Sequence, residues 1–175
     1  MSTPSLSTAG GALLSLGYAG QPANLEESST FTLHNESTTG GDDSAGMLDF
    51  GIAVARGTND GYCKRIAADG DLPVGITVRH PTMPATTTGY VGYKASTAVP
   101  IMYLGCIYAE AYEDVVAGDQ VISVTAQGGK LSGTHSGIVG AGRVLVPNAY
   151  WVKAVSAGSV GLIRLTGVCN PNTTT

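Results

Sequence analysis

A chain of 175 residues, of which 43% are hydrophobic and 13% charged, can bury the core of one domain, which excludes a wholly disordered protein. All nine lysines and arginines lie at or after Arg56, whereas six acidic residues precede it: Glu26, Glu27, Glu36, Asp42, Asp43 and Asp49. This acidic first part excludes a nucleic-acid-binding arm, because phosphate binding needs lysine or arginine to displace counterions.

Residues 1–28 are predicted to form an extended arm, because glycine, proline and small polar residues leave no periodic hydrophobic pattern there. Within this arm, a short apolar group forms a candidate anchor: Leu13, Leu14, Leu16 and Tyr18. The group is too short for a signal peptide and has no basic residues before it. No run elsewhere approaches the roughly 18 apolar residues of a membrane span, so no membrane partner is expected.

Residues 29–168 are predicted to form an all-β body, and residues 169–175 a polar C-terminal tail. Phe31 and Leu33 alternate with polar residues, which predicts a half-buried first strand. Further strand-like runs, each bounded by glycine or proline, lie at residues 50–56, 62–67, 73–80, 99–111, 120–125, 138–146, 149–155 and 160–166. Short strands at such intervals are typical of a small antiparallel β-barrel or sandwich. Residues 110–116 are the best candidate for a short helical turn.

The run at residues 99–111 is apolar on both faces, whereas a strand with one face in solvent alternates apolar and polar residues. Two interpretations remain open. The strand is central to a core, which is the commoner arrangement, or one face forms a contact between subunits. Tyrosine, a residue type enriched at interfaces, is locally abundant. The expected self-association residues are therefore Met102, Leu104, Tyr108 and Tyr112.

No recognisable catalytic set is present. His135 and Ser136 are adjacent, but neighbouring side chains on a strand point to opposite faces and rarely act together as base and nucleophile. Residues 137–142 miss the glycine spacing of a dinucleotide-binding loop. The basic residues are isolated along the chain, which gives no patch for nucleic acid. No catalytic residue, cofactor or nucleic-acid partner is therefore predicted.

Metal binding is not predicted either. Several aspartates carry oxygens suited to calcium, yet aspartate, asparagine and glycine also close ordinary surface turns, which is the favoured interpretation. These aspartates are Asp42, Asp43, Asp60, Asp69 and Asp71. The cysteines lack the CxxC spacing of zinc and redox sites and are expected to be free, mostly buried thiols of a protein made in a reducing cytosol. They are Cys63, Cys106 and Cys169.

Three segments of the body carry a family resemblance. They are residues 50–57 with 73–78, residues 99–121, and residues 147–165. The second is the most specific: a strand begins at Val99-Pro100, Gly105 permits close packing, and Ala117-Gly118-Asp119 turns into the next strand. In this order of elements the chain resembles the structural cement, or decoration, proteins of tailed-bacteriophage capsids over about residues 30–168.

The resemblance implies a β-barrel body, an N-terminal extension, self-association and no catalytic residues. It implies attachment to the outer surface of an icosahedral head, where the protein stabilises contacts between capsomers. The implied partners are the major capsid protein and further copies of the chain, in the virion, after synthesis in the cytoplasm of a bacterial host. The candidate capsid contacts are then Leu13, Leu14, Leu16, Tyr18, Glu26 and Glu27, with the carboxylates facing a groove lined by lysine or arginine.

Two other function classes remain open. A carbohydrate-binding or adhesive β-module would need exposed aromatic side chains as a sugar platform, and the candidates are Tyr90, Tyr93 and Trp151. A hydrolase would have to use His135 and Ser136.

Overall fold

The computed structural model describes residues 17–23, 28–37, 46–80, 85, 89–134 and 139–168. The strands are β1 (Ser29–Asn35), β2 (Ala53–Arg56), β3 (Tyr62–Arg65), β4 (Pro73–Thr77), β5 (Ala98–Glu110), β6 (Gln120–Val124), β7 (Lys130–Thr134), β8 (Arg143–Trp151) and β9 (Val160–Thr166). A 3-10 helix, η2 (Thr125–Gln127), lies between β6 and β7. The expected all-β fold is confirmed, and no helix within the described ranges is long and apolar enough to cross a membrane.

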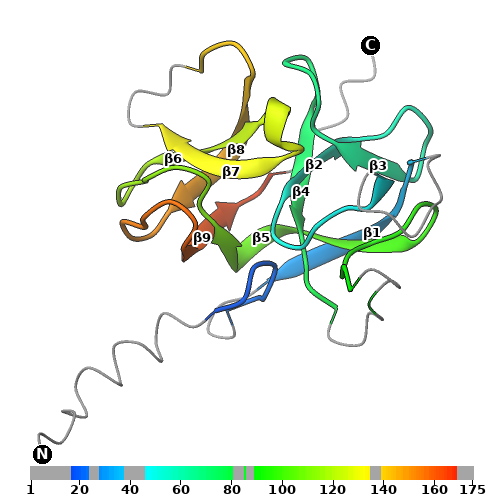
Figure 1. Ribbon diagram of the computed structural model, residues 1–175, viewed down its shortest axis with the longest axis horizontal. Coiled ribbons are helices and arrows are strands. Elements are labelled where there is room, and N and C mark those ends of the chain that lie inside the picture. The colour runs from blue at the N-terminus through cyan, green and yellow to red at the C-terminus, as the bar shows by residue number, and fades with distance from the viewer. Residues whose placement is uncertain are drawn as a thin grey trace, which may run out of the picture.

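The first lobe is a closed five-stranded barrel (Figure 1, right). Its strands follow the order β1-β3-β2-β4-β5, and β1 also pairs with β5, which closes the ring. All neighbours are antiparallel except β1 and β3, which run parallel. The barrel interior is packed with apolar side chains such as Leu33, Val54, Cys63 and Ile101.

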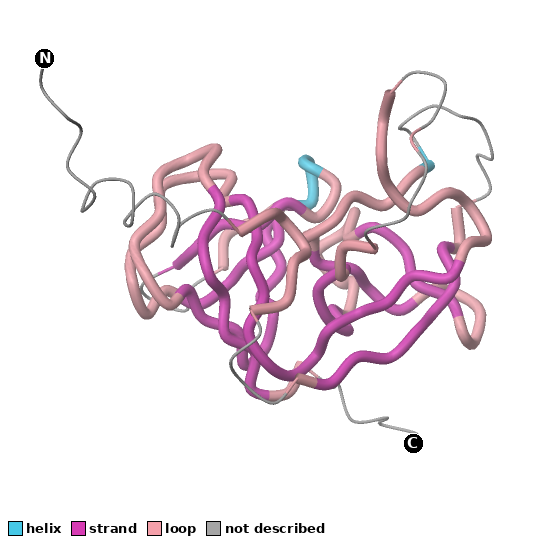
Figure 2. The backbone as a smooth tube through the Cα atoms, turned by 90° about the horizontal axis from the view of Figure 1, so that it is seen from below, coloured by secondary structure: helices cyan, strands magenta, loops and turns pink. Residues whose placement is uncertain are grey.

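The second lobe continues the same sheet in the order β5-β9-β8-β6-β7 (Figure 1, left). Ala111, directly after β5, makes an isolated parallel bridge with Leu131 of β7, so this lobe nearly closes as well. Because β5 is 13 residues long, its first half pairs in the barrel and its second half pairs with β9. Figure 2 shows the two groups of strands side by side from below.

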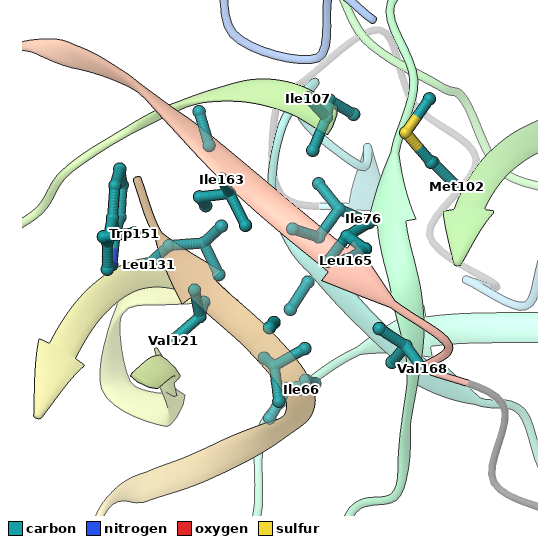
Figure 3. Packing of buried hydrophobic residues seen from close by; sticks show 14 of the residues in the cluster. Ile66, Ile76, Met102, Ile107, Val121, Leu131, Trp151, Ile163, Leu165 and Val168 are labelled. Carbon is teal, nitrogen blue, oxygen red and sulfur yellow. The ribbon is translucent and has the colours of Figure 1, made fainter. Parts of the chain in front are cut away.

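A large hydrophobic cluster fills the second lobe and reaches the outer face of the barrel (Figure 3). The barrel wall that meets this lobe is therefore buried on both faces. In β2, Val54 points into the barrel, while Ala53 and Ala55 belong to the large cluster. The first three residues of β2 are therefore all apolar, because both faces of this part of the strand pack against protein.

The same geometry explains why β5 is apolar on both faces. Ile101 lies in the barrel interior and Met102 in the large cluster. Gly105 has a φ of 116°, and beyond it the odd-numbered Ile107 and Ala109 join the large cluster. The interpretation of this strand as central to a core is confirmed for these residues.

The prediction of the elements is wrong in three details. The runs at 138–146 and 149–155 both contribute residues to one strand, β8, which contains Pro147. Residues 143–145, before Pro147, pair with β6, and residues 149–151, after it, pair with β9, with Tyr150 also paired to β6. Proline is tolerated there because its missing N–H removes no ladder hydrogen bond. Strand β7 is absent from the prediction because Leu131 is its only large apolar residue. Residues 110–116 are not helical, since Val115 bridges to another turn.

Glu36 fastens the end of β1 to the β2–β3 hairpin. Its carboxylate accepts hydrogen bonds from the backbone N–H of Thr58 at 2.8 Å and of Asn59 at 3.0 Å. The hydrogen bond from Thr58 is the main cause that lowers the pKa of Glu36. Asp49 also has a partner within the body, Arg65, at 3.3 Å. Two of the six carboxylates in the acidic first part of the chain therefore bind groups within the body.

Replacing Glu36 by Gln should loosen the loop at Thr58 and Asn59 without unfolding the body, because two backbone N–H groups lose a charged acceptor. Since the folded-state pKa is lowered, the contact stabilises the loop above the ordinary value of 4.5 and is lost as the pH falls through the lowered value. Amide exchange of Thr58 and Asn59, corrected for intrinsic rates, should rise on acidification in the parent protein only. Equal protection of both proteins at neutral pH would contradict this role.

Candidate docking surface

Residues 17–23, here called the strap, lie against the junction of the two lobes like a short added strand. Gly20 N donates a hydrogen bond to Tyr108 O at 2.7 Å, and Tyr108 N donates to Gln21 O at 2.9 Å. On the other side, Arg79 N donates to Gly20 O at 2.7 Å. The strap therefore pairs with the second half of β5 and with the residues after β4, although it falls within the arm expected from the sequence.

Two glycines allow the strap to lie close to Tyr108 and Arg79. A Cβ atom on Gly17 would lie 2.1 Å from the ring of Tyr108. Gly20 has a φ of 79°, and a Cβ atom there would lie 2.8 Å from Arg79 N. Both positions need a residue without a side chain, and Gly20 also needs the left-handed conformation that glycine adopts without strain.

An aromatic side chain of the strap, Tyr18, and a cation beside it, Arg79, both face solvent. Tyr18 is 64% exposed, and the guanidinium carbon of Arg79 lies 5.1 Å from the centre of its ring. The same guanidinium lies 5.4 Å from the ring centre of Phe50. This is cation–π geometry, which holds the arginine between the strap and the barrel.

A hollow of about 350 Å³ opens next to this group. Residues of the strap and of both lobes line this hollow. The lining includes side chains of both charges: Asp49, Arg79, Glu110 and Lys130. Tyr18, Arg79 and this hollow form a surface suited to a polypeptide segment, because it offers an aromatic face, a cation and a concave wall. We call it the strap surface.

Replacing Gly20 by Val should release the strap, because the side chain would collide with Arg79 N and with Phe50 Cβ, 2.9 Å away. The amide of Tyr108 would then lose its acceptor and should exchange at least about tenfold faster. Gly70→Val is the matched control, since no atom lies within 4 Å of a Cβ atom at that position. Unchanged exchange at Tyr108 would show that the strap remains docked.

The structure places only part of the expected capsid-contact set. Leu13, Leu14, Leu16, Glu26 and Glu27 lie outside the described residues. Tyr18 is exposed at the strap surface. The contacts of Arg79 with the rings of Tyr18 and Phe50 are not predictable from the sequence, because they join segments that are distant along the chain.

The expected self-association set needs one correction. Met102 is fully buried in the large cluster, so its side chain packs within the subunit and cannot reach a second copy. Leu104 and Tyr108 are half-buried on β5, and Tyr108 lies directly beneath Gly17. Tyr112 is 37% exposed and remains available.

The expected sugar platform is wrong, because two of its aromatic residues are buried. Tyr93 and Trp151 are each 1% exposed. The hydroxyl of Tyr93 donates to the backbone oxygen of Val78, and burial raises the pKa of Tyr93 to about 12. Trp151 Nε1 donates to Ser132 O at 2.9 Å. The proposed hydrolase residues at positions 135 and 136 lie outside the described ranges.

The aspartates have structural partners where the structure describes them. Asp60 pairs with an arginine at 2.6 Å, Asp69 accepts a backbone N–H at 3.0 Å, and Asp71 accepts two backbone N–H groups at 2.8 and 2.9 Å. Asp60 and Asp69 lie in turns, as the favoured interpretation predicts, and Asp71 lies just after the second of these turns. Asp42 and Asp43 lie outside the described residues. Within the ranges given above, no group of three His, Cys, Asp or Glu could hold a metal ion.

The cysteines follow the expectation where they are described. Cys63 and Cys106 are buried and not joined by a disulfide. Burial raises the pKa of Cys63 to about 12, which keeps the thiol protonated and unreactive. Cys169 lies outside the described residues.

Comparisons with known proteins show the family and the fold of this chain. Residues 7–166 match the family described as structural cement protein (E217 gp24/Pam3 gp6). The chain is also similar to a chain of the solved structure "The capsid of Myoviridae Phage XM1", with a TM-score of 0.60 and 17% identity. That likeness covers 87% of this chain and 91% of the other, and it shows a shared fold. No curated protein matches the sequence.

Proposed function

Because this chain belongs to the structural cement protein family, we propose that it attaches to the outer surface of an icosahedral phage head and stabilises contacts between capsomers. Its partner is the major capsid protein, and its place of action is the virion. The family is a structural one, and no catalytic step belongs to this role.

The strap is the observation that carries the proposal. Backbone hydrogen bonds tie residues 17–23 to the body at the junction of the two lobes. The sixteen residues before Gly17 therefore start from a fixed point beside exposed Tyr18. Fully extended, a segment of that length spans at most about 58 Å. It can cover part of a neighbouring capsomer while the body stays on another.

Such an arm stabilises a shell through several modest contacts. Once the body is bound, each arm contact forms at a high effective concentration, so the contacts reinforce one another. Leu13, Leu14 and Leu16 supply apolar contacts in this proposal, and Tyr18 extends them to the strap surface. Glu26 and Glu27 face lysine or arginine of the capsid protein, which chiefly speeds the encounter.

Sedimentation with phage heads that lack the protein tests this role. Purified full-length chain should sediment with such heads and saturate at a fixed ratio to the capsid protein. Tyr18→Ser should lower the occupancy, whereas Leu72→Ser, which changes another exposed apolar side chain, should not. If the parent protein stays in the supernatant at all concentrations, head attachment is wrong.

A further inference from the structure

The outward side of strands β5, β9 and β8 is a largely apolar surface of the second lobe. Trp151 of β8 pairs with Ile163 of β9, and both residues belong to the large cluster. Successive residues of a strand point to opposite faces, so Tyr150 and Val152, the two neighbours of Trp151, point outward. Their exposed fractions of 37% and 40% agree with this orientation.

The register of the three strands aligns the outward side chains. Tyr108 of β5 pairs with Leu162 of β9, and Val152 N of β8 donates to Leu162 O at 2.9 Å, so these residues form one row across the sheet. Arg164 of β9 pairs with Tyr150 of β8 and lies next to this row. Directly paired residues of antiparallel strands share a face. We call the surface formed by Tyr108, Leu162, Val152, Tyr150 and Arg164 the outer sheet face.

The described chain begins on top of this face. Ile107 and Ala109 belong to the large cluster, so Tyr108 between them points outward. A Cβ atom on Gly17 would lie 2.1 Å from the ring of Tyr108, which means that Gly17 lies against that ring. The sixteen preceding residues are therefore attached to a point on the outer sheet face.

Residues 12–16 match the row in chemistry and in length. They read Ala-Leu-Leu-Ser-Leu, and the first 25 residues carry no charged side chain. In an extended segment Leu14 and Leu16 lie on one side, because side chains alternate. One extended residue spans about 3.4 Å and three span about 10 Å, whereas strands lie about 4.8 Å from the next strand and about 10 Å from the next but one. Leu16 can therefore reach Leu162, and Leu14 can reach Val152.

We propose that residues 12–16 of the free protein dock on the outer sheet face of the same chain, and that they leave this face when the protein attaches to a head. The attachment at Gly17 gives the segment an effective concentration on the order of millimolar at this face, which favours a contact within one chain. Docking covers the apolar side chains of the segment and of the face together. Only the release from the face rests on the proposed function.

Cysteine cross-linking of the full chain without heads tests the docking. Leu14→Cys combined with Val152→Cys should form a disulfide within one chain under oxidised glutathione, because docking brings the two Cα atoms within the roughly 7 Å that a disulfide needs. The rate should not depend on protein concentration. Leu13→Cys combined with Val152→Cys is the matched control, since residue 13 has a similar reach but points away from the sheet. Its yield should be several-fold lower.

A comparison of two deletions tests the docking with native side chains. Deleting residues 1–16 should increase the broadening of the NMR signals of Tyr150 and Val152 by a soluble paramagnetic compound. Deleting residues 1–11, which spares the apolar segment, should not. The docked segment makes a local contact on strands that the core already holds, so neither deletion should change the melting temperature much.

Three results would overturn the docking: equal yields from the Leu13 and Leu14 pairs, equal broadening in the two deletions, or a disulfide that forms only between two chains. A Leu14→Cys variant with native Val152 measures the background reaction with the native cysteines. Because these measurements contain no heads, their outcome is independent of whether the protein binds heads. When heads are added and the protein sediments with them, the yield of the Leu14 pair should fall, and an undiminished yield would contradict the release.

Discussion

Replacing Ile107 by Asp should leave the chain unfolded. Ile107 is fully buried in the large cluster and lies opposite Ile163 of β9. An unpaired carboxylate at this position costs several kcal/mol, which is comparable with the whole stability of a domain, about 5–15 kcal/mol. Circular dichroism and thermal melting measure the effect directly.

Leu104→Asp is the matched control on the same strand. Leu104 is half-buried between Ser29 and Thr166, so a carboxylate there remains in contact with water. This variant should fold, with a moderately lower melting temperature. If the two variants melt alike, the division of β5 into a buried and a partly exposed face is wrong.

Deleting residues 1–16 should leave the body folded but remove most of its attachment to heads. The deletion spares the strap, so the hydrogen bonds of Gly20 and Tyr108 persist and the melting temperature should stay near that of the parent. Occupancy on heads should fall strongly, because the arm supplies the contacts with the neighbouring capsomer in the proposed function. Sedimentation with heads and thermal melting belong in the same experiment.

Deleting residues 1–28 distinguishes the contribution of the strap from that of the residues before it. This longer deletion also removes the backbone bonds of residues 17–23, each of which contributes on the order of 1 kcal/mol. Its melting temperature should therefore fall below that of the shorter deletion. Normal head occupancy of both deletions would mean that the body alone binds the capsid.

The all-β class and most strands are predictable from the sequence because glycine and proline bound short apolar runs. The two lobes are not, since β2 and β5 are apolar on both faces and their pattern does not say which lobe each face meets. Pro147 resembles a strand end, yet β8 passes through it where no ladder bond is needed. The local hydrophobic pattern of a strand shows that its faces are buried. Which lobe each face packs against depends on the topology of the sheet.

The candidate surfaces are predictable only in part. Tyr18 and Tyr112 stand out as aromatic residues and are exposed in the structure. The strap escapes prediction because it docks through backbone groups of Gly20 and Gln21, which leave no side-chain pattern. The reciprocal backbone pairing of Val115 and Val155 has a faint sequence signal, since a valine followed after one residue by Ala-Gly occurs at both positions.

A density map of heads decorated with the full-length chain tests the central claim most directly. Attachment through the arm predicts an all-β body on the outer surface of the shell, with continuous density from Gly17 across the boundary to a neighbouring capsomer. A body bound within one capsomer, with no density from its N-terminal residues on the neighbour, would contradict the proposed stabilising role.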